Sequence, residues 1–276
     1  MDSIMTHYIF TFRMISRIFL ILGVFICVLI TGCASTSRDG TARPTQDTSG
    51  NESDQRGRAR AHAELAKGYY EIGNLNVALE ELQIALQADS NFFYTLNVAG
   101  LIHAALGDQA LAEQFFNRAI RLNQTDPETN NNFGQFLCAL QREEEGERYL
   151  LDALKNPLYK TPELALINLG ICLRRKGLYE RSEGYFQRAL SMQPNYPTAL
   201  YQLAELFLIR KELLQSQEYF RRLESLLQPT PELLWLGIRL HRQLDDRLSV
   251  ASYSLQLRKY FPESREAADL QNGRFE

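Results

Sequence analysis

Cysteine and histidine side chains are the first candidates for chemistry in this 276-residue chain. His62, His103 and His241 stand far apart and lack the spacing of metal ligands. The acidic run at 142–148, REEEGER, is expected to be a solvated helix face. No Gly-rich phosphate loop follows a strand-like pattern. The sequence therefore predicts no catalytic residue, metal, cofactor or small-molecule substrate, and we expect a protein that is not an enzyme.

Cys33 is the cysteine with the most specific surroundings. It ends the tetrapeptide Ile30-Thr31-Gly32-Cys33, which follows an apolar run of 13 residues at 18–30 and the basic residues Arg13 and Arg17. The run is shorter than the roughly 20 residues of a transmembrane helix and has the length of a signal-peptide core. The tetrapeptide resembles the lipobox of bacterial lipoproteins, which implies cleavage before Cys33 and acylation of its thiol. The alternative is an uncleaved membrane helix with a chance cysteine.

The sequence around Cys33 also predicts the first domain boundaries. Residues 1–32 are expected to be a signal peptide, with Met14 as an alternative start. Residues 33–57 are expected to be the lipidated N-terminus and a flexible tether, because 34–56 are rich in Ser, Thr, Gly and Asp and lack large apolar side chains. By analogy with enterobacterial sorting, Ala34 rather than Asp favours the outer membrane. We therefore expect a lipid-anchored domain facing the periplasm.

A 34-residue period runs through residues 58–264. Three helical patterns share a leucine, a small residue four positions later and another small residue twelve beyond it. These triples are Leu96/Gly100/Ala112, Leu166/Gly170/Ser182 and Leu200/Ala204/Ser216. The period and residue classes are those of tetratricopeptide repeats. We expect an all-α, right-handed superhelical solenoid of six repeats, 59–92, 93–126, 127–160, 163–196, 197–229 and 230–263, followed by a C-terminal tail at 265–276.

The spacing of small residues has a physical cause. A small residue on each helix of a hairpin lets the two helices approach closely, and large residues fill the gap to the next hairpin. Gly73, Gly107 and Gly177 are expected to end first helices with a left-handed residue. Repeat five departs from this pattern, with Arg210-Lys211 at its turn.

Cys138 and Cys172 each fall on the first helix of a repeat, 34 residues apart. First helices of neighbouring repeats run side by side, so the two thiols can lie close. A disulfide would persist in the oxidising compartment that the lipobox implies, and this interpretation is favoured. The alternative is two separate buried thiols that pack as small apolar side chains.

Four stretches depart from the generic repeat in a particular way. They are 131–138 (NNFGQFLC), 156–159 (NPLY), 168–172 (NLGIC) and 234–239 (LWLGIR). Together with the lipobox and six repeats, they resemble the type IV pilus biogenesis lipoproteins called PilF or PilW, over residues 33 to about 264. The resemblance implies a pilotin, a lipoprotein of the outer membrane that helps the pilus secretin, PilQ, to reach and multimerise in that membrane.

Two surfaces are candidates for binding such a partner. Val77 and Ile84 lie seven residues apart on a second helix where charged residues are usual, so they share a face that could be an apolar patch or simply scattered surface residues. The expected concave groove offers polar side chains by their position in the repeat, namely Lys67, Tyr70, Asn97, Asn131, Gln135, Arg174 and Tyr201.

Charge and motif content limit the alternatives. The net charge is −3 with both signs interspersed, which predicts no nucleic-acid partner. A repeat lipoprotein of another outer-membrane machine, such as that for β-barrel insertion, would share the lipobox and the repeats. It would not be expected to carry the stretches at 131–138 and 234–239.

Overall fold

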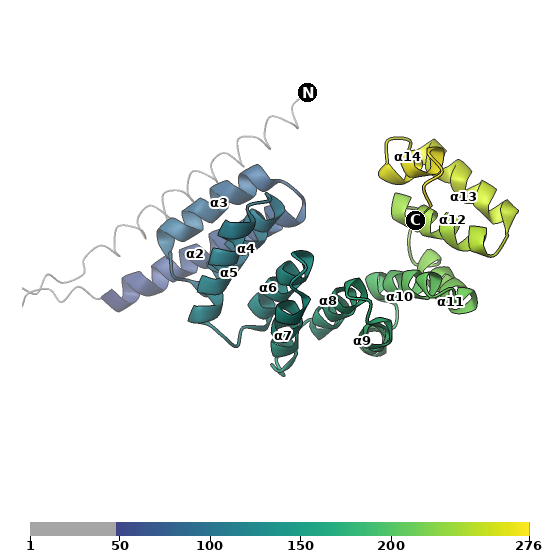
Figure 1. The fold of residues 1–276 in the computed structure, drawn as a ribbon. Helices are drawn as coiled ribbons and strands as arrows, with labels where there is room; N and C mark the ends of the chain where they lie inside the picture. Colours follow the sequence, from purple (N-terminus) through teal and green to yellow (C-terminus); the bar gives the residue numbers. More distant parts are fainter. Residues whose placement is uncertain (1–47, 276) are drawn as a thin grey trace, which may run out of the picture. The chain divides into compact units, whose positions relative to one another are not determined.

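The computed structural model describes residues 48–275, and these residues form thirteen α-helices and no strand. Twelve of them make six consecutive hairpins, coloured from purple to yellow-green in Figure 1. The pairs are α2 (Thr48–Glu71) with α3 (Leu75–Ala88), α4 (Phe93–Ala105) with α5 (Gln109–Leu122), α6 (Pro127–Ala139) with α7 (Glu143–Leu154), α8 (Pro162–Arg175) with α9 (Tyr179–Met192), α10 (Pro197–Ile209) with α11 (Leu213–Glu224), and α12 (Pro231–Gln243) with α13 (Arg247–Tyr260).

The hairpins stack in chain order. The first helices of successive hairpins contact one another from α2 to α10, and each second helix packs against the first helix that follows it. This one-dimensional packing confirms the predicted all-α superhelical repeat fold of six units. None of the helices in residues 48–275 combines the length and apolar character needed to cross a membrane. The predicted signal peptide and the predicted lipidation site, Cys33, lie outside the described residues.

Small residues permit the close approach of the two helices in a hairpin, as their spacing predicts. A Cβ atom on Gly100 would lie 2.7 Å from the ring of Phe116, and one on Gly170 would collide with Phe186. Ser182 Oγ occupies the second small position and donates to the backbone oxygen of Gly170 at 2.7 Å. Tight contact and a buried hydrogen bond therefore join the helices at one point.

In all six hairpins, the turn between the two helices contains a residue in the left-handed backbone conformation. Glycine takes this role in three hairpins, with φ of 77° at Gly73, 84° at Gly107 and 79° at Gly177. The others place Gln141, Lys211 and Asp245 there, with φ of 60°, 62° and 53°. A side chain in this conformation costs about 1 kcal/mol or more. The hairpin geometry is thus kept even where the sequence lacks glycine.

Helix α2 begins at Thr48, so the last ten residues of the tether predicted at 33–57 are helical instead. No proline interrupts this segment, and contacts with the next hairpin hold its helix. Arg56 Nε lies 3.0 Å from Asp89 Oδ2, and the guanidinium of Arg60 lies 5.2 Å from the ring centre of Phe92. The composition of the segment did not predict that α2 begins so early, because these contacts come from residues about thirty positions away.

The predicted tail at 265–276 contains a further helix, α14 (Arg265–Gln271). Ser264 caps it by accepting a hydrogen bond from Ala267 N at 3.1 Å. The helix packs on α12 and α13, and the ring of Phe275 stacks on Trp235 with centroids 5.5 Å apart. The last hairpin is therefore covered by its own chain, whereas a terminal repeat is expected to face water.

Candidate partner-binding face

The first helices α2, α4, α6, α8, α10 and α12 together present one face, called here the first-helix face. Each of the polar residues predicted to bind a partner lies on one of these helices. They differ in exposure: Asn97 and Asn131 are buried, Gln135 is exposed, and Lys67, Tyr70, Arg174 and Tyr201 are half-buried.

Asparagine side chains link three successive first helices. Asn168 Nδ2 on α8 donates to Asn131 Oδ1 on α6 at 3.0 Å. Asn131 Nδ2 donates to Asn132 Oδ1 at 3.2 Å, and Asn132 Nδ2 donates to Asn97 Oδ1 on α4 at 3.1 Å. An amide group has two donors and two acceptor lone pairs, so each side chain keeps unused hydrogen-bonding capacity. Asn97 and Asn131 are buried, so the capacity open to a partner belongs to the half-buried Asn132 and Asn168.

Charged side chains continue the face beyond the asparagines. Glu205 on α10 accepts from Arg174 Nη1 of α8 at 2.7 Å and from Arg239 Nη1 of α12 at 3.3 Å. The three side chains are only 17–20% exposed. Two guanidinium groups share one carboxylate, and Glu232 of α12 acts on the neighbouring Tyr201, so both signs of charge meet in this part of the face.

Tyrosines on the same face stay protonated at neutral pH. Burial, followed by Glu71, raises the pKa of Tyr70. Burial raises the pKa of Tyr201 to about 12, with Glu205 adding to the rise. Burial also raises the pKa of Tyr94 to about 12, followed by Glu128. Their hydroxyl groups therefore remain hydrogen-bond donors to a partner.

A pocket of about 420 Å³ opens among α4, α6 and α8 on the first-helix face. Gln135, Asn132, Asn168 and Tyr70 contribute polar atoms to its lining, and apolar side chains such as Phe136 and Ile171 complete it. The pocket joins an amide row to apolar surface, which is the composition expected for binding a peptide segment.

A disulfide borders this pocket through Cys138, one of the residues that line it. Cys138 on α6 and Cys172 on α8 have their sulfurs 1.97 Å apart and their Cα atoms 5.4 Å apart. Both side chains are buried against Leu150 and Leu169. The bond joins two of the first helices that carry the asparagine row, so it holds them at fixed separation.

The apolar pair predicted on α3 is less accessible than the sequence suggested. Val77 and Ile84 are both half-buried. The larger apolar surface of the first hairpin lies at the C-terminal end of α2 and the turn after it, where Leu65 is 49% and Ile72 is 74% exposed. These two side chains, with Gly68 between them, line a pocket of about 550 Å³ on the helix surface.

Sequence reasoning missed several residues of the first-helix face. Glu205 and Arg239 were not recognised, although they occupy the same repeat position 34 residues apart with opposite charge. Glu128 on α6 was also missed. Its Oε2 atom lies 3.9 Å from the Nζ atom of Lys67 on α2. A search for complementary side chains one or two periods apart would have found the first pair.

The histidines make local contacts with carboxylates. His62 Nδ1 lies 2.6 Å from Glu81 Oε2, and His241 Nδ1 lies 3.0 Å from Asp246 Oδ2. His103 stacks on Phe115 with centroids 5.3 Å apart, as a packing residue would. Residues 48–275 contain no group of three or more potential metal ligands.

Models of the tetratricopeptide repeat match residues 63–127 and 163–196. The type IV pilus assembly protein PilF of Pseudomonas aeruginosa is 27% identical over 251 residues, covering 91% of this chain and 96% of PilF. The crystal structure of PilW, described as a widely conserved type IV pilus biogenesis factor, superposes with a TM-score of 0.71 at 29% identity, covering 77% of this chain and 98% of PilW. A structure of Pseudomonas aeruginosa PilF gives 0.67 at 26% identity, covering 80% and 99%.

The hairpins and the repeat models define the chain as a tetratricopeptide-repeat protein. Its similarity to PilF and PilW extends over nearly their whole length. The chain is therefore a tetratricopeptide-repeat protein homologous to the type IV pilus biogenesis proteins PilF and PilW.

Proposed function

We propose that this protein is a pilotin, an outer-membrane lipoprotein that binds the secretin subunit of the type IV pilus and promotes its localisation and multimerisation. Cys33 would carry the lipid, and the remaining segment before α2 would link the repeats to the membrane. Acylation with two or more chains gives stable anchoring where a single chain does not. The protein would act as a scaffold without catalysis.

The first-helix face carries this proposal. Its amide row and the ion pairs of Glu205 with Arg174 and Arg239 lie on helices that successive hairpins hold in register, so a partner would meet a preorganised surface. The exposed apolar surface formed by Leu65 of α2 and Ile72 of the turn after it adds a second contact in the first hairpin, which follows the proposed anchor in the sequence. Exposed apolar patches of this kind mark interaction sites.

Co-purification tests the proposal. The tagged protein would be isolated from solubilised outer membranes of cells that contain or lack the secretin gene. We expect the secretin subunit to co-purify, and its yield to fall when Leu65 and Ile72 are both replaced by Asp. A tagged protein that retains no secretin, although the secretin is present in the same membranes, would contradict the proposal.

A further inference from the structure

Two hairpins have an arginine at the same repeat position of their second helix. Arg118 Nη2 on α5 donates to the backbone oxygen of Ser90 at 3.0 Å, and Arg222 Nη2 on α11 donates to that of Pro194 at 2.8 Å. Ser90 and Pro194 lie in the loops that precede the first helix of each hairpin. The arginine thus ties its second helix to that loop.

Hairpin three has an aspartate where this arginine is expected. Asp152 lies 34 residues after Arg118, on α7. A carboxylate cannot donate to the loop carbonyl, and Asp152 Oδ1 instead accepts from Lys155 Nζ at 2.6 Å. The loop oxygen equivalent to that of Ser90 belongs to Gln124, and it accepts from Asn130 Nδ2 at 2.9 Å.

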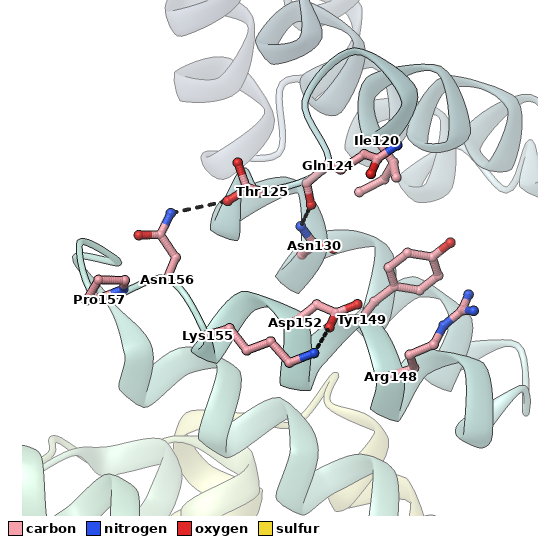
Figure 2. A pocket seen from close by; sticks show the side chains of 10 residues that line it. All are labelled: Ile120, Gln124, Thr125, Asn130, Arg148, Tyr149, Asp152, Lys155, Asn156 and Pro157. Atoms are coloured by element: carbon pink, nitrogen blue, oxygen red, sulfur yellow. Dashed lines mark hydrogen bonds and ion pairs between the residues drawn. The ribbon is translucent and has the colours of Figure 1, made fainter.

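The substitution leaves a pocket of about 610 Å³ between α5, α7 and the loop at 123–126. Figure 2 shows Asp152, Tyr149, Asn156 and the loop residues Gln124 and Thr125 around it. Asn156 Nδ2 donates to Thr125 O at 3.2 Å. Backbone oxygens have two lone pairs, so the Gln124 and Thr125 carbonyls each keep a second acceptor site.

Asp152 supplies the carboxylate of the pocket lining, which also contains Arg148 and Lys155, so an incoming cation must bind Asp152 in place of Lys155. Lys155 is 75% exposed at its side chain, so its bond to Asp152 is a weak surface pair that an incoming group can displace. The guanidinium of Arg148 lies 4.7 Å from the ring centre of Tyr149 and remains exposed to solvent. An arginine matches two carbonyls and a carboxylate better than a lysine does, because its five donors lie in one plane.

We propose that this pocket binds an arginine side chain of a partner protein, which takes the place of the arginine that hairpins two and five supply themselves. The guanidinium donates to the carboxylate of Asp152 and to the free lone pairs of the loop carbonyls. The pocket lies on the side of the second helices, so this contact is separate from the first-helix face. It does not depend on the partner being the secretin.

N-acetylarginine amide is a direct probe of the pocket, with neutral N-acetylcitrulline amide as its isosteric control. We would titrate both into the 15N-labelled full-length protein and follow the side-chain amide signals of Asn130 and Asn156 by NMR. The arginine compound is expected to shift these signals saturably, and the citrulline compound to bind about tenfold more weakly because it lacks the charge. Equal binding of the two compounds, or no saturable shift, would overturn the proposal.

Two variants of Asp152 provide matched controls. Asp152→Asn keeps the shape of the pocket and should weaken binding of the arginine compound about tenfold. Asp152→Arg should fill the pocket from within, as Arg118 and Arg222 do, and abolish binding while raising the melting temperature. Unchanged binding in either variant would place the compound elsewhere and refute the assignment; Asp152→Asn keeps the test valid if Asp152→Arg does not fold.

Discussion

Asn168 Nδ2 donates to Asn131 Oδ1 at 3.0 Å, and this bond links the asparagine row of α6 to helix α8. Asn131 is 5% exposed, so neither water nor another side chain readily replaces it. The row therefore serves the packing of the hairpins as well as any partner.

Replacing Asn131 by Ala should destabilise the protein by about 1–2 kcal/mol, because the Asn168 amide loses its acceptor while partly buried. Urea unfolding followed by circular dichroism measures this change. Gln135→Ala is the matched control on the same helix: its side chain is exposed and the change should stay within about 0.5 kcal/mol. An equal loss in both variants would show that the row has no special role in stability.

The disulfide between Cys138 and Cys172 closes a long loop across two hairpins. The double replacement by Ser should lower the free energy of unfolding by about 2–4 kcal/mol, since the unfolded chain regains the freedom that the bond removes. Unfolding of the wild type with and without reductant provides the comparison, and the reduced protein should match the variant. Free thiols at both positions in non-reduced peptides of the protein isolated from its native cells would contradict the bond.

The helices of hairpin four approach too closely for a side chain at Gly170. Gly170→Ala should destabilise by about 1–3 kcal/mol, because the new methyl group collides with the Phe186 ring. A methyl group on Gly184 of α9 would instead meet nothing within 4 Å beyond the backbone of its own helix. Gly184→Ala should therefore stabilise the helix by up to about 1 kcal/mol. Thermal unfolding of the two variants tests the contrast, and a stabilising Gly170→Ala would refute the packing account.

These stability predictions rest on spacing that the sequence shows directly. The small residues at Gly100, Gly170 and Ser182 predict hairpins because close helix packing requires them, and the period predicts six units. Long-range contacts are harder to predict. The helical start at Thr48 depends on Arg56 and on the hairpin that follows, and α14 depends on a surface left by α12 and α13.

The candidate binding residues were predicted less completely than the fold. The repeat positions of Asn97, Asn131 and Arg174 predicted that they share one face. The contacts of Asn131 with Asn168 and of Arg174 with Glu205 were not predicted, because they depend on the rotation between neighbouring hairpins. Exposure is also a tertiary property. For this reason Val77 and Ile84 were expected on an outer surface, where the structure leaves them half-buried.

The first hairpin offers two apolar pairs whose replacement should differ. Leu65→Asp with Ile72→Asp should reduce secretin multimers while leaving stability nearly unchanged, because both side chains are exposed. Val77→Asp with Ile84→Asp should reduce multimers and also lower stability, because these side chains are half-buried. Immunoblots of heat-stable secretin multimers and melting temperatures of the purified variants provide both readouts.

Exposed leucines elsewhere in the repeats provide the control for that experiment. Leu214 is 76% and Leu255 is 67% exposed, and they lie on α11 and α13. Replacing both by Asp should leave the multimers at the wild-type level. If this distant pair and the pair Leu65 and Ile72 reduced assembly equally, the effect would not belong to a binding surface on the first hairpin.

The proposed pilotin function requires that this repeat protein, anchored by its lipid, assembles the pilus secretin at the outer membrane. Its most direct test is the amount of heat-stable secretin multimer in outer-membrane fractions from wild-type cells, cells lacking this gene, and cells with Cys33→Ser. We expect secretin multimers to be lost in cells lacking the gene. We expect a marked decrease in cells with Cys33→Ser, because the protein leaves the membrane fraction. Multimers at the wild-type level in cells lacking the gene would contradict it.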